Sequence, residues 1–369
     1  MRKLQVAVVA PSLRILGGQA VQADRLLRAW HDDPEVDAWL VPVNPLPPGP
    51  LRHLTSIKYA RTIVTELTYL TPLLRTLAAA DVLHVFSASY TSFLLAPLPA
   101  MLAARVLRKP VVLNYRSGEA PDHLARSAIA RRAIRSADLN IVPSSFLVGV
   151  FRRFGIAAQT IPNLVDLDRF KFRERQQLQP RLLSTRNFDA LYNVACTLRA
   201  FRIVQARYPN AMLTLVGGGP QEAALRQLVA DLQLQHVTFA GRMDPEAIAD
   251  AYAAHDIYIQ SPNIDNMPTS VIEAFASGLP VVSTEAGGIP AILTSGQHGW
   301  LAPIDDHVVL ASHVLHLLDD PIGARRVARA AHVTTHQCTW PAVRLQWLRA
   351  YRRALPAPIA PRHPASVTR

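Results

Sequence analysis

Short apolar runs that alternate with amphipathic stretches constrain the fold of this chain more than any other feature. The runs are rich in Val, Ile and Leu and lack period-two alternation, which is typical of strands covered on both faces. Stretches such as Glu222–Leu232 and Glu246–Ala253 carry the i, i+3, i+4 apolar spacing of helices. This alternation predicts parallel sheets with right-handed crossovers. The predicted strands are Gln5–Ala10, Ala38–Val43, Val82–Phe86, Val111–Tyr115, Leu139–Val142, Thr160–Ile161, Arg181–Ser184, Met212–Val216, Val237–Ala240, Ile257–Gln260 and Pro280–Ser283.

One polar segment, Phe170–Pro180, interrupts the alternation and predicts a linker between two domains. The length of 369 residues also favours two domains, since one domain usually takes roughly 100–200 residues. We expect Rossmann-like α/β domains at residues 1–169 and 181–340, joined by a linker at 170–180. Residues 355–369 are rich in Pro, Ala and Arg, and this composition predicts a disordered tail.

Charge and composition narrow the class of protein. The chain has 39 Lys and Arg against 27 Asp and Glu, a net charge of +12, which suits a phosphorylated substrate, an anionic membrane or nucleic acid. Nucleic-acid binding is not expected, because no basic platform is interleaved with aromatic residues. The two cysteines, Cys196 and Cys338, form no metal or disulfide pattern and favour a reducing, cytoplasmic compartment. The longest apolar stretch, Phe93–Ala104, is too short for a membrane-spanning helix, which needs roughly 20 residues.

Two glycine-rich loops follow predicted strands. Gly17 and Gly18 come after the first strand, and Gly217, Gly218 and Gly219 come after the strand that ends at Val216. Such loops let the backbone approach a ligand and aim the amides of the next helix at an anion. In doubly wound sheets, ligands bind at this end of the strands. Plain tight turns are the alternative for both loops, and the first lacks the dinucleotide fingerprint of a nicotinamide-dependent dehydrogenase.

The strongest functional signal is the segment between residues 257 and 280. A predicted strand runs into a loop that carries Asp265, and a helix starts near Pro268 with hydroxyl residues in its first turn. Glu273 lies eight residues after Asp265 among apolar residues, so we expect its carboxylate to be partly buried and to need hydrogen-bond donors. Ribose hydroxyls would supply them; neighbouring backbone groups are the alternative. The two carboxylates can therefore hold two hydroxyl groups of one extended ligand.

This segment, with Gly287-Gly288-Ile289-Pro290 after it, resembles the donor-site signature of retaining glycosyltransferase family 4. The segments 81–84, 137–144 and 161–166 also resemble that family, over residues 1 to about 353. The resemblance implies the GT-B fold, two Rossmann-like domains across a cleft, with a helix at 341–354 that returns to the first domain. It implies retaining transfer of a hexose-type sugar from a UDP- or GDP-sugar to a glycan, lipid-linked or small-molecule acceptor. No metal and no cofactor beyond the donor are implied.

Residue by residue, the resemblance assigns three side chains to the chemistry. Asp265 stands where the family binds the sugar, Arg186 where it binds phosphate, and Arg116 where many members have a His near the anomeric carbon. The residues implied at the donor are Gly17 and Gly18 near the diphosphate, Asn266, Met267, Pro268 and Thr269 at the sugar, Ser270 and Val271 at the diphosphate, Glu273 at the ribose, and Arg242 and Met243 at the nucleobase.

The chain departs from the family pattern at three positions. No Lys follows Arg186, Arg116 replaces the usual His, and Asp265 replaces the usual first Glu. Because Arg stays protonated, Arg116 can donate hydrogen bonds but cannot accept a proton. Two alternatives therefore stay open: a catalytically weak partner subunit of a polysaccharide assembly system, and a sugar-nucleotide epimerase of the same architecture.

The segment 125–135 places basic and apolar residues on one predicted helix. Such a helix can lie in a membrane interface, and we expect peripheral contact with an anionic membrane at the inner face of the cell. A solvated helix with an Arg-rich face is the alternative.

Overall fold

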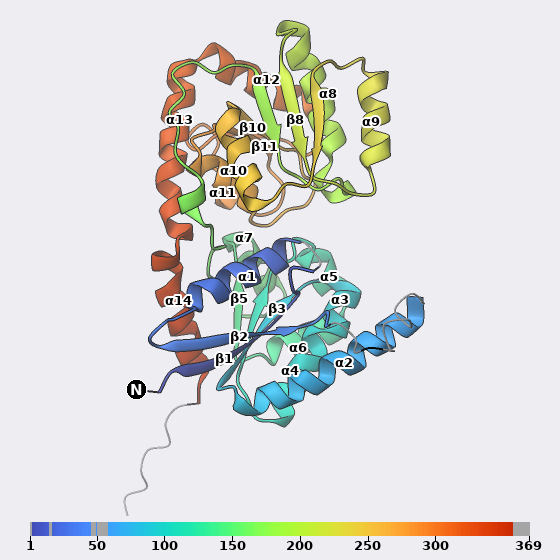
Figure 1. Ribbon diagram of the computed structural model, residues 1–369, viewed down its shortest axis with the longest axis vertical. Coiled ribbons are helices and arrows are strands. Elements are labelled where there is room, and N and C mark those ends of the chain that lie inside the picture. The colour runs from blue at the N-terminus through green and yellow to red at the C-terminus, as the bar shows by residue number, and fades with distance from the viewer. Residues whose placement is uncertain (1, 15–16, 46–48, 50–57, 357–369) are drawn as a thin grey trace, which may run out of the picture.

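Two parallel sheets form the centres of two α/β domains, which are stacked along the long axis of the molecule (Figure 1). The computed structural model describes residues 2–14, 17–45, 49 and 58–356. All strand pairs in both sheets are parallel, so the predicted fold class of two Rossmann-like domains is confirmed. Most of the tail predicted at 355–369 lies outside the described residues.

The first domain is built on a six-stranded sheet. In spatial order its strands are β2 (Val36–Pro42), β1 (Leu4–Ala10), β3 (Val82–Ser87), β4 (Val111–Tyr115), β5 (Leu139–Val142) and β6 (Gln159–Thr160). Its helices are α1 (Gly18–Trp30), α2 (Lys58–Ala79), α3 (Tyr90–Leu95), α4 (Pro97–Val106), α5 (Ala120–Arg126), α6 (Ala128–Arg135) and α7 (Ser145–Arg153). Residues 6–10 of β1 are all buried, and alternate side chains enter the cores on opposite faces of the sheet. Burial on both faces explains why the apolar runs show no period-two alternation.

The second domain repeats this plan. In spatial order its strands are β12 (Trp300–Ala302), β11 (Val281–Thr284), β10 (Ile257–Ile259), β7 (Arg181–Ser184), β8 (Met212–Val216) and β9 (Val237–Gly241). Its helices are α8 (Val194–Arg207), α9 (Glu222–Asp231), α10 (Pro245–Ala254), α11 (Thr269–Ala276), α12 (His307–Asp319) and α13 (Pro321–Thr334). The edge strand β12 was not among the predicted strands, because three residues after a polar loop give no apolar run. Short 3-10 turns are η2 (Leu167–Arg169), η3 (Ala190–Tyr192), η4 (Ile289–Ala291) and η5 (Thr335–Cys338).

The predicted linker at 170–180 contains no helix or strand and is fastened to the second domain. The buried guanidinium of Arg175 donates to the carbonyl oxygens of Tyr252 and Ser277, at 3.0 and 2.9 Å. The same side chain forms an ion pair with the buried Asp256, at 3.1 Å. Burial lowers the pKa of Arg175 to about 10, so the group stays charged at neutral pH.

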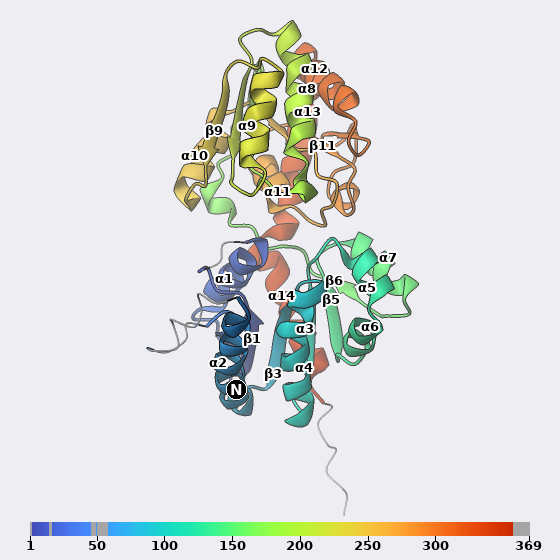
Figure 2. The same cartoon turned by 90° about the vertical axis from the view of Figure 1, so that its right-hand side faces the viewer.

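The last helix returns the chain to the first domain. Figures 1 and 2 show α13 in the second domain followed by α14 (Trp340–Ala354) beside the first sheet. Trp347 and Tyr351 of α14 are buried in the same core as Val112 of β4. Arg344 holds the start of the helix through an ion pair with Asp33, at 2.6 Å. Within the described residues, no helix combines the length and apolar character needed to cross a bilayer.

A buried histidine connects α14 to the end of β4. His84 on β3 is fully buried; its Nδ1 lies 2.8 Å from the Tyr351 hydroxyl and its Nε2 lies 3.1 Å from the amide nitrogen of Asn114. Asn114 accepts from Arg116 through its amide oxygen, at 3.3 Å, so its amide nitrogen faces His84. This assignment makes Nε2 an acceptor and places the ring proton on Nδ1. Burial, with the nearby charge of Arg116, lowers the pKa of His84 to about 3, so the ring is neutral.

The depressed pKa of His84 predicts acid sensitivity of the fold. The unfolded chain takes up a proton at His84 below about pH 6.5, whereas the folded chain does not until about pH 3. The contribution of neutral His84 to the free energy of unfolding is therefore fully present above about pH 6.5. It is lost as the pH falls below that value, at up to about 1.4 kcal/mol per pH unit. Urea unfolding between about pH 7 and pH 4.5 should give a shallower pH dependence for His84→Gln than for the unmodified chain. Equal slopes would contradict this assignment.

Candidate functional site

A cavity of about 580 Å³ lies between the domains, where the carboxyl ends of the two sheets face each other. The loops that line it follow β1, β3, β4, β5 and β6 in the first domain, and β7 and β10 in the second. The lining residues are Gly18, Gln19, Gln22, Ala88, Ser89, Tyr90, Thr91, Ser92, Arg116, Ser117, Gly118, Glu119, Pro143 and Asn163 from the first domain, and Arg186, Leu191, Tyr192, Ile264, Asp265, Asn266, Met267, Pro268 and Thr269 from the second.

The loop from Asp265 to Thr269 forms the wall on the side of the second domain. Two glycines support it from behind: the amide of Gly288 donates to the carbonyl oxygen of Asp265 at 3.2 Å. A Cβ atom at Gly288 would overlap the carbonyl oxygen of Asn266, and one at Gly287 would overlap that of Asp265. Gly287 also has a φ of +53°, a left-handed conformation that glycine adopts without strain. The Gly-Gly-Ile-Pro turn therefore fixes the position of this loop.

Arg186 and Asp265, both predicted at the site, form an ion pair in the cavity wall. Arg186 also donates to the Ser270 hydroxyl at 3.1 Å and lies over the Tyr192 ring, 4.0 Å from its centroid. Burial opposes the charge of Arg186, but Asp265 and neighbouring tyrosines outweigh it, so the pKa of Arg186 is raised. The guanidinium is therefore a fixed cation with one carboxylate partner.

Arg116 is a second cation in the wall, on the side of the first domain. It follows β4 and donates to the amide oxygens of Asn114 and Asn163. Its guanidinium lies 5.4 Å from the centroid of the Phe86 ring. Among the described residues no carboxylate forms an ion pair with it, and burial lowers its pKa to about 9. A half-buried cation without a carboxylate partner is costly, so an anionic group of a ligand would stabilise Arg116, although the cavity wall also carries the carboxylate of Glu119.

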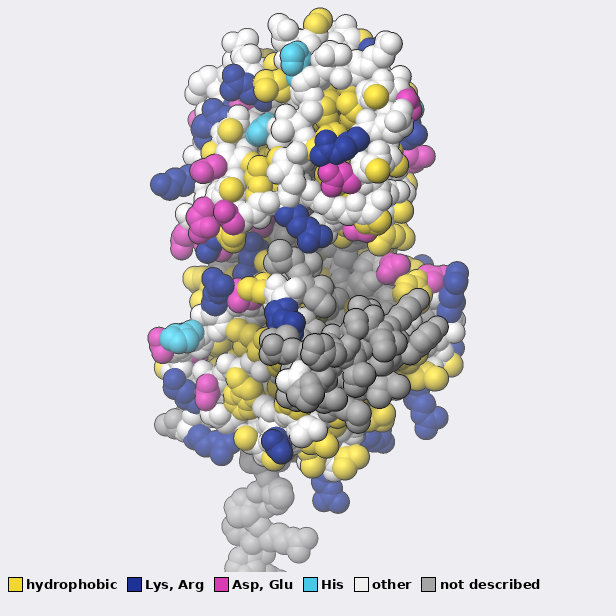
Figure 3. All heavy atoms as spheres, turned by 45° about the vertical axis from the view of Figure 1, so that its right-hand side comes forward, with side chains coloured by type: hydrophobic (Ala, Val, Ile, Leu, Met, Phe, Trp, Pro, Cys, Tyr) yellow, Lys and Arg dark blue, Asp and Glu magenta, His cyan; other side chains and the backbone are white. Residues whose placement is uncertain are grey.

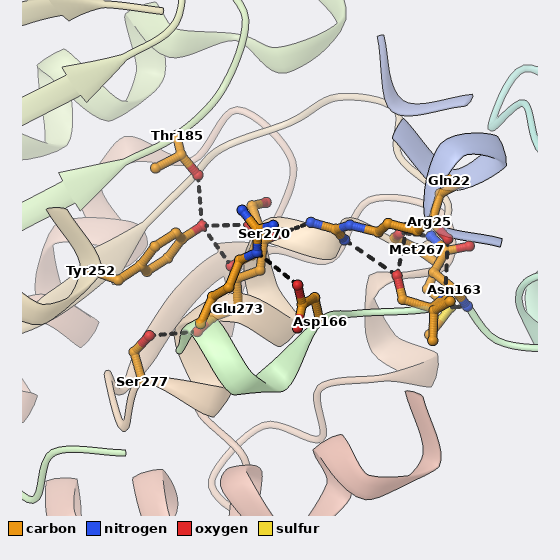
Figure 4. Close-up of polar contacts among 12 residues, drawn as sticks. Gln22, Arg25, Asn163, Asp166, Thr185, Tyr252, Met267, Ser270, Glu273 and Ser277 are labelled. Carbon is orange, nitrogen blue, oxygen red and sulfur yellow. Dashed lines mark hydrogen bonds and ion pairs between the residues drawn. The ribbon is translucent and has the colours of Figure 1, made fainter. Parts of the chain in front are cut away.

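A fourth charged group, Glu273, pairs with a residue that the sequence analysis did not single out. Its Oε1 accepts from Arg25 of α1 at 3.0 Å, and the hydroxyl of Tyr252 lies 3.4 Å from its Oε2 (Figure 4). Arg25 belongs to the first domain and lies 248 positions away in sequence. The prediction of a partly buried Glu273 agrees with its position, but the structure supplies an interdomain cation rather than a backbone donor. No local pattern could have indicated this pairing.

Two further polar contacts join the domains at the cavity. The amide nitrogen of Asn163 donates to the carbonyl oxygen of Met267 at 2.7 Å, and the Ser144 hydroxyl contacts the amide oxygen of Asn266. Asn163 thus connects Arg116 to the Asp265–Thr269 loop. Neither Asn163 nor Ser144 was predicted at the site, because their roles depend on how the two domains pack.

The other predicted donor residues divide into two groups. Gly18 and the residues from Asn266 to Thr269 line the cavity, and Gly17 precedes the first turn of α1. The side chain of Val271 is fully buried in the core. Those that do not line the cavity are Gly17, Gly217, Gly218, Gly219, Arg242, Met243, Ser270, Val271 and Glu273.

The glycine loop after β8 supports the site from outside the cavity. A Cβ atom at Gly217 would overlap the carbonyl oxygen of Arg186, and Gly219 packs as closely on the backbone of Phe188. Arg242 is exposed and lies beside Gly218. This loop therefore holds the backbone after β7 in place. Across the described residues, no group of three or more His, Cys, Asp or Glu side chains converges as a metal site would.

Comparison with known proteins gives matches along nearly the whole chain. The model "Glycosyltransferase Family 4" matches residues 4–169, and the model "Glycosyl transferases group 1" matches residues 168–333. The sulfoquinovosyl transferase SQD2 of Arabidopsis thaliana is 26% identical over 70% of this chain, which spans about half of that protein (54%). The phosphatidyl-myo-inositol mannosyltransferase of Mycolicibacterium smegmatis is 28% identical over 73% of this chain and 70% of its own length.

Solved structures show the same architecture. Sucrose-phosphate synthase from Thermosynechococcus elongatus has a TM-score of 0.77 at 21% identity, over 95% of this chain and 99% of its own. Anabaena HepE, solved in complex with UDP-glucose, has a TM-score of 0.75 at 16% identity, with the same coverage of both chains. These likenesses confirm the two-domain GT-B fold.

The supporting role of Gly288 can be tested by adding one methyl group. Gly288→Ala forces a Cβ atom against the backbone of Asn266, and we expect it to destabilise the chain by about 1–3 kcal/mol. Gly18→Ala is the matched control, because no heavy atom lies within 4 Å of a Cβ there. Thermal unfolding should separate the two variants. If Gly288→Ala unfolds at the same temperature as Gly18→Ala, the Gly-Gly turn does not hold the loop.

Proposed function

Because this chain belongs to the GT-B glycosyltransferases of group 1 and family 4, we propose that it transfers a hexose-type sugar, with retention of anomeric configuration, from a nucleotide sugar to an acceptor. The acceptor is a glycan, a lipid-linked saccharide or a small molecule. The observation that carries this proposal is the pair of cations, Arg116 and Arg186, on opposite walls of one interdomain cavity. The UDP-glucose named for Anabaena HepE supports a nucleotide-sugar donor, which we expect to be a UDP- or GDP-sugar.

The donor diphosphate would lie between Arg116 and Arg186. Family members usually place a Lys shortly after the phosphate-binding Arg, and this chain has none. Arg116 replaces that missing charge better than Arg242, because Arg116 lines the cavity without a carboxylate partner whereas Arg242 lies outside it. The sugar would contact the loop from Asp265 to Thr269, and the ribose would bind Glu273. The nucleobase would lie near Gly241 to Met243.

The chemistry would be driven by stabilising the leaving group. In the front-face scheme, the bond between the anomeric carbon and the phosphate oxygen breaks while the acceptor oxygen attacks the same face. The departing diphosphate gains negative charge, which Arg116, Arg186 and the N-terminus of α11, all at the cavity, would stabilise. The acceptor proton passes to the leaving phosphate oxygen. No protein base is needed in this scheme, which suits a cation at position 116.

Nucleotide binding tests the proposal directly. Arg116→Gln should raise the Kd of UDP or GDP about tenfold, equivalent to about 1.4 kcal/mol, because it removes a cation that has no other charge partner. This is a cleaner test than removing Arg186, since breaking its buried pair with Asp265 would by itself cost roughly 3–5 kcal/mol. The exposed Arg202 of α8 provides the control Arg202→Gln. Calorimetry that gives the same Kd for both variants would remove Arg116 from the donor site.

A panel of UDP- and GDP-sugars would identify the donor, because a bound donor raises the unfolding temperature by mass action. The stabilising donor is then incubated with acceptors, and the anomeric configuration of the product is determined. Retention supports the proposal, and inversion contradicts it. Donor binding without transfer or hydrolysis would favour the non-catalytic partner subunit.

We also propose that the first domain contacts an anionic membrane through the α4–α6 face. This face consists of the exposed apolar residues Leu102, Val106 and Ile129 and the exposed basic residues Arg105, Arg108 and Arg132. None of the three arginines has an ion-pair partner within the described part of the chain. Figure 3 shows basic and apolar side chains next to each other along the lower edge of this domain. Exposed apolar side chains on the same helices as unpaired cations suit an interface with anionic lipid.

Vesicle sedimentation tests the α4–α6 face. The full chain should sediment with vesicles that contain anionic lipid and stay in solution with neutral vesicles. The double substitution of Leu102 and Val106 by Ser should reduce sedimentation several-fold, because both side chains are exposed and would insert into the interface. Val308→Ser with Ile322→Ser, at exposed positions of the second domain, is the matched control. Equal sedimentation of both double variants would show that the α4–α6 face is not the membrane contact.

A further inference from the structure

The ion pair between Arg25 and Glu273 joins the two domains at one edge of the cavity (Figure 4). The two side chains are 20% and 11% exposed, so water screens the pair only partly. Arg25 is held further by a hydrogen bond to the carbonyl oxygen of Leu164, at 3.2 Å. Gln22, one turn earlier on α1, forms two hydrogen bonds with the backbone of Leu164. Its amide nitrogen donates to the Leu164 carbonyl oxygen at 2.8 Å, and its amide oxygen accepts from the Leu164 N–H at 3.0 Å. Hydrogen bonds within the first domain therefore fix the position of the Arg25 guanidinium.

The carboxylate of Glu273 is engaged on both oxygens. Arg25 contacts Oε1, and the Tyr252 hydroxyl lies near Oε2. The same hydroxyl lies 2.8 Å from that of Thr185 and 3.1 Å from the carbonyl oxygen of Ser270. The cavity wall reaches Thr269 and does not include Glu273, which is buried. A ligand that binds both oxygens of this carboxylate must displace Arg25 from Oε1.

We propose that Arg25 is an interdomain latch that competes with the donor ribose for Glu273. This inference rests on the proposed function, in which Glu273 binds the ribose. Without a donor, Arg25 neutralises Glu273 and holds α1 against α11. When a nucleotide binds, its ribose hydroxyls take over Glu273 and Arg25 is released, so donor binding loosens one contact between the domains. The free energy of the ion pair, which must be broken when the nucleotide binds, makes the free energy of nucleotide binding less favourable by the same amount.

The latch predicts that removing Arg25 lowers the Kd of the nucleotide, whereas charge attraction alone predicts that it raises the Kd. Removing a cation near an anionic ligand normally weakens binding. If Arg25 competes for Glu273, its removal instead leaves a largely buried carboxylate without a charge partner, and the ribose hydroxyls then bind it more favourably. The direction of the change in Kd therefore separates the latch from a cation that contacts the diphosphate or positions Glu273.

The test measures the Kd of UDP and of GDP by calorimetry for the full chain and its variants. Arg25→Met should lower the Kd of the nucleotide that binds about tenfold, and Arg25→Gln should have an intermediate effect because it keeps a hydrogen-bond donor. Arg28→Met is the matched control, because Arg28 lies on the same helix in an exposed pair with Asp24. In a Glu273→Gln background, Arg25→Met should no longer improve binding, since the competition is gone.

The outcomes separate the latch from the proposed function. An unchanged or raised Kd for both Arg25 variants, with Glu273→Gln still weakening binding, would overturn the latch and leave the donor site standing. Tighter binding of Arg25→Met in both backgrounds would also overturn it, because the gain would not depend on Glu273. Failure of the unmodified chain and all variants to bind either nucleotide would overturn the proposed function and the latch with it. Thermal unfolding of each variant checks that it is folded.

Discussion

Burial of parallel strands on both faces is the constraint on which the rest of this structure depends. A strand such as β3, with every residue buried, can present side chains to a ligand only where it ends, so functional side chains gather in the loops after the strands. The two sheets point these ends at each other, and one cavity collects loops from both. Tight backbone contacts, at Gly217 after β8 and at Gly287 and Gly288 after β11, then hold the loops of the second domain in register.

The arginines at the cavity differ in their partners, and the wall also carries the carboxylate of Glu119. Arg186 is matched by Asp265 and Arg25 by Glu273, whereas Arg116 has only amide oxygens and an aromatic ring as partners. The neutral His84 behind Asn114 adds no compensating charge. Arg116 belongs to the first domain and lines the same cavity as the Asp265–Thr269 loop. An anion between the domains would therefore satisfy Arg116 and bridge the two walls at once.

The strands, the helix starts and the Asp265–Thr269 loop could be predicted from sequence, because each depends on a run of neighbouring residues. The edge strand β12 was not predicted, because its three residues are too few to show a strand pattern. Contacts between the domains could not be predicted for a different reason. Arg25 and Glu273 lie 248 positions apart, and no sequence pattern near either residue indicates that the two are paired. The same holds for Asn163, which the packing places between Arg116 and Met267. The sequence predicted which groups carry charge, but only the structure indicates which charges are already paired.

We propose that Arg116 and Arg186, the cation pair of the cavity, hold a nucleotide diphosphate between the domains. A crystal structure of the full chain with UDP or GDP tests it most directly. We expect phosphate oxygens within hydrogen-bond distance of both Arg116 and Arg186, at the carboxyl ends of β4 and β7. A nucleotide bound away from this cavity, or in contact with neither arginine, would contradict it.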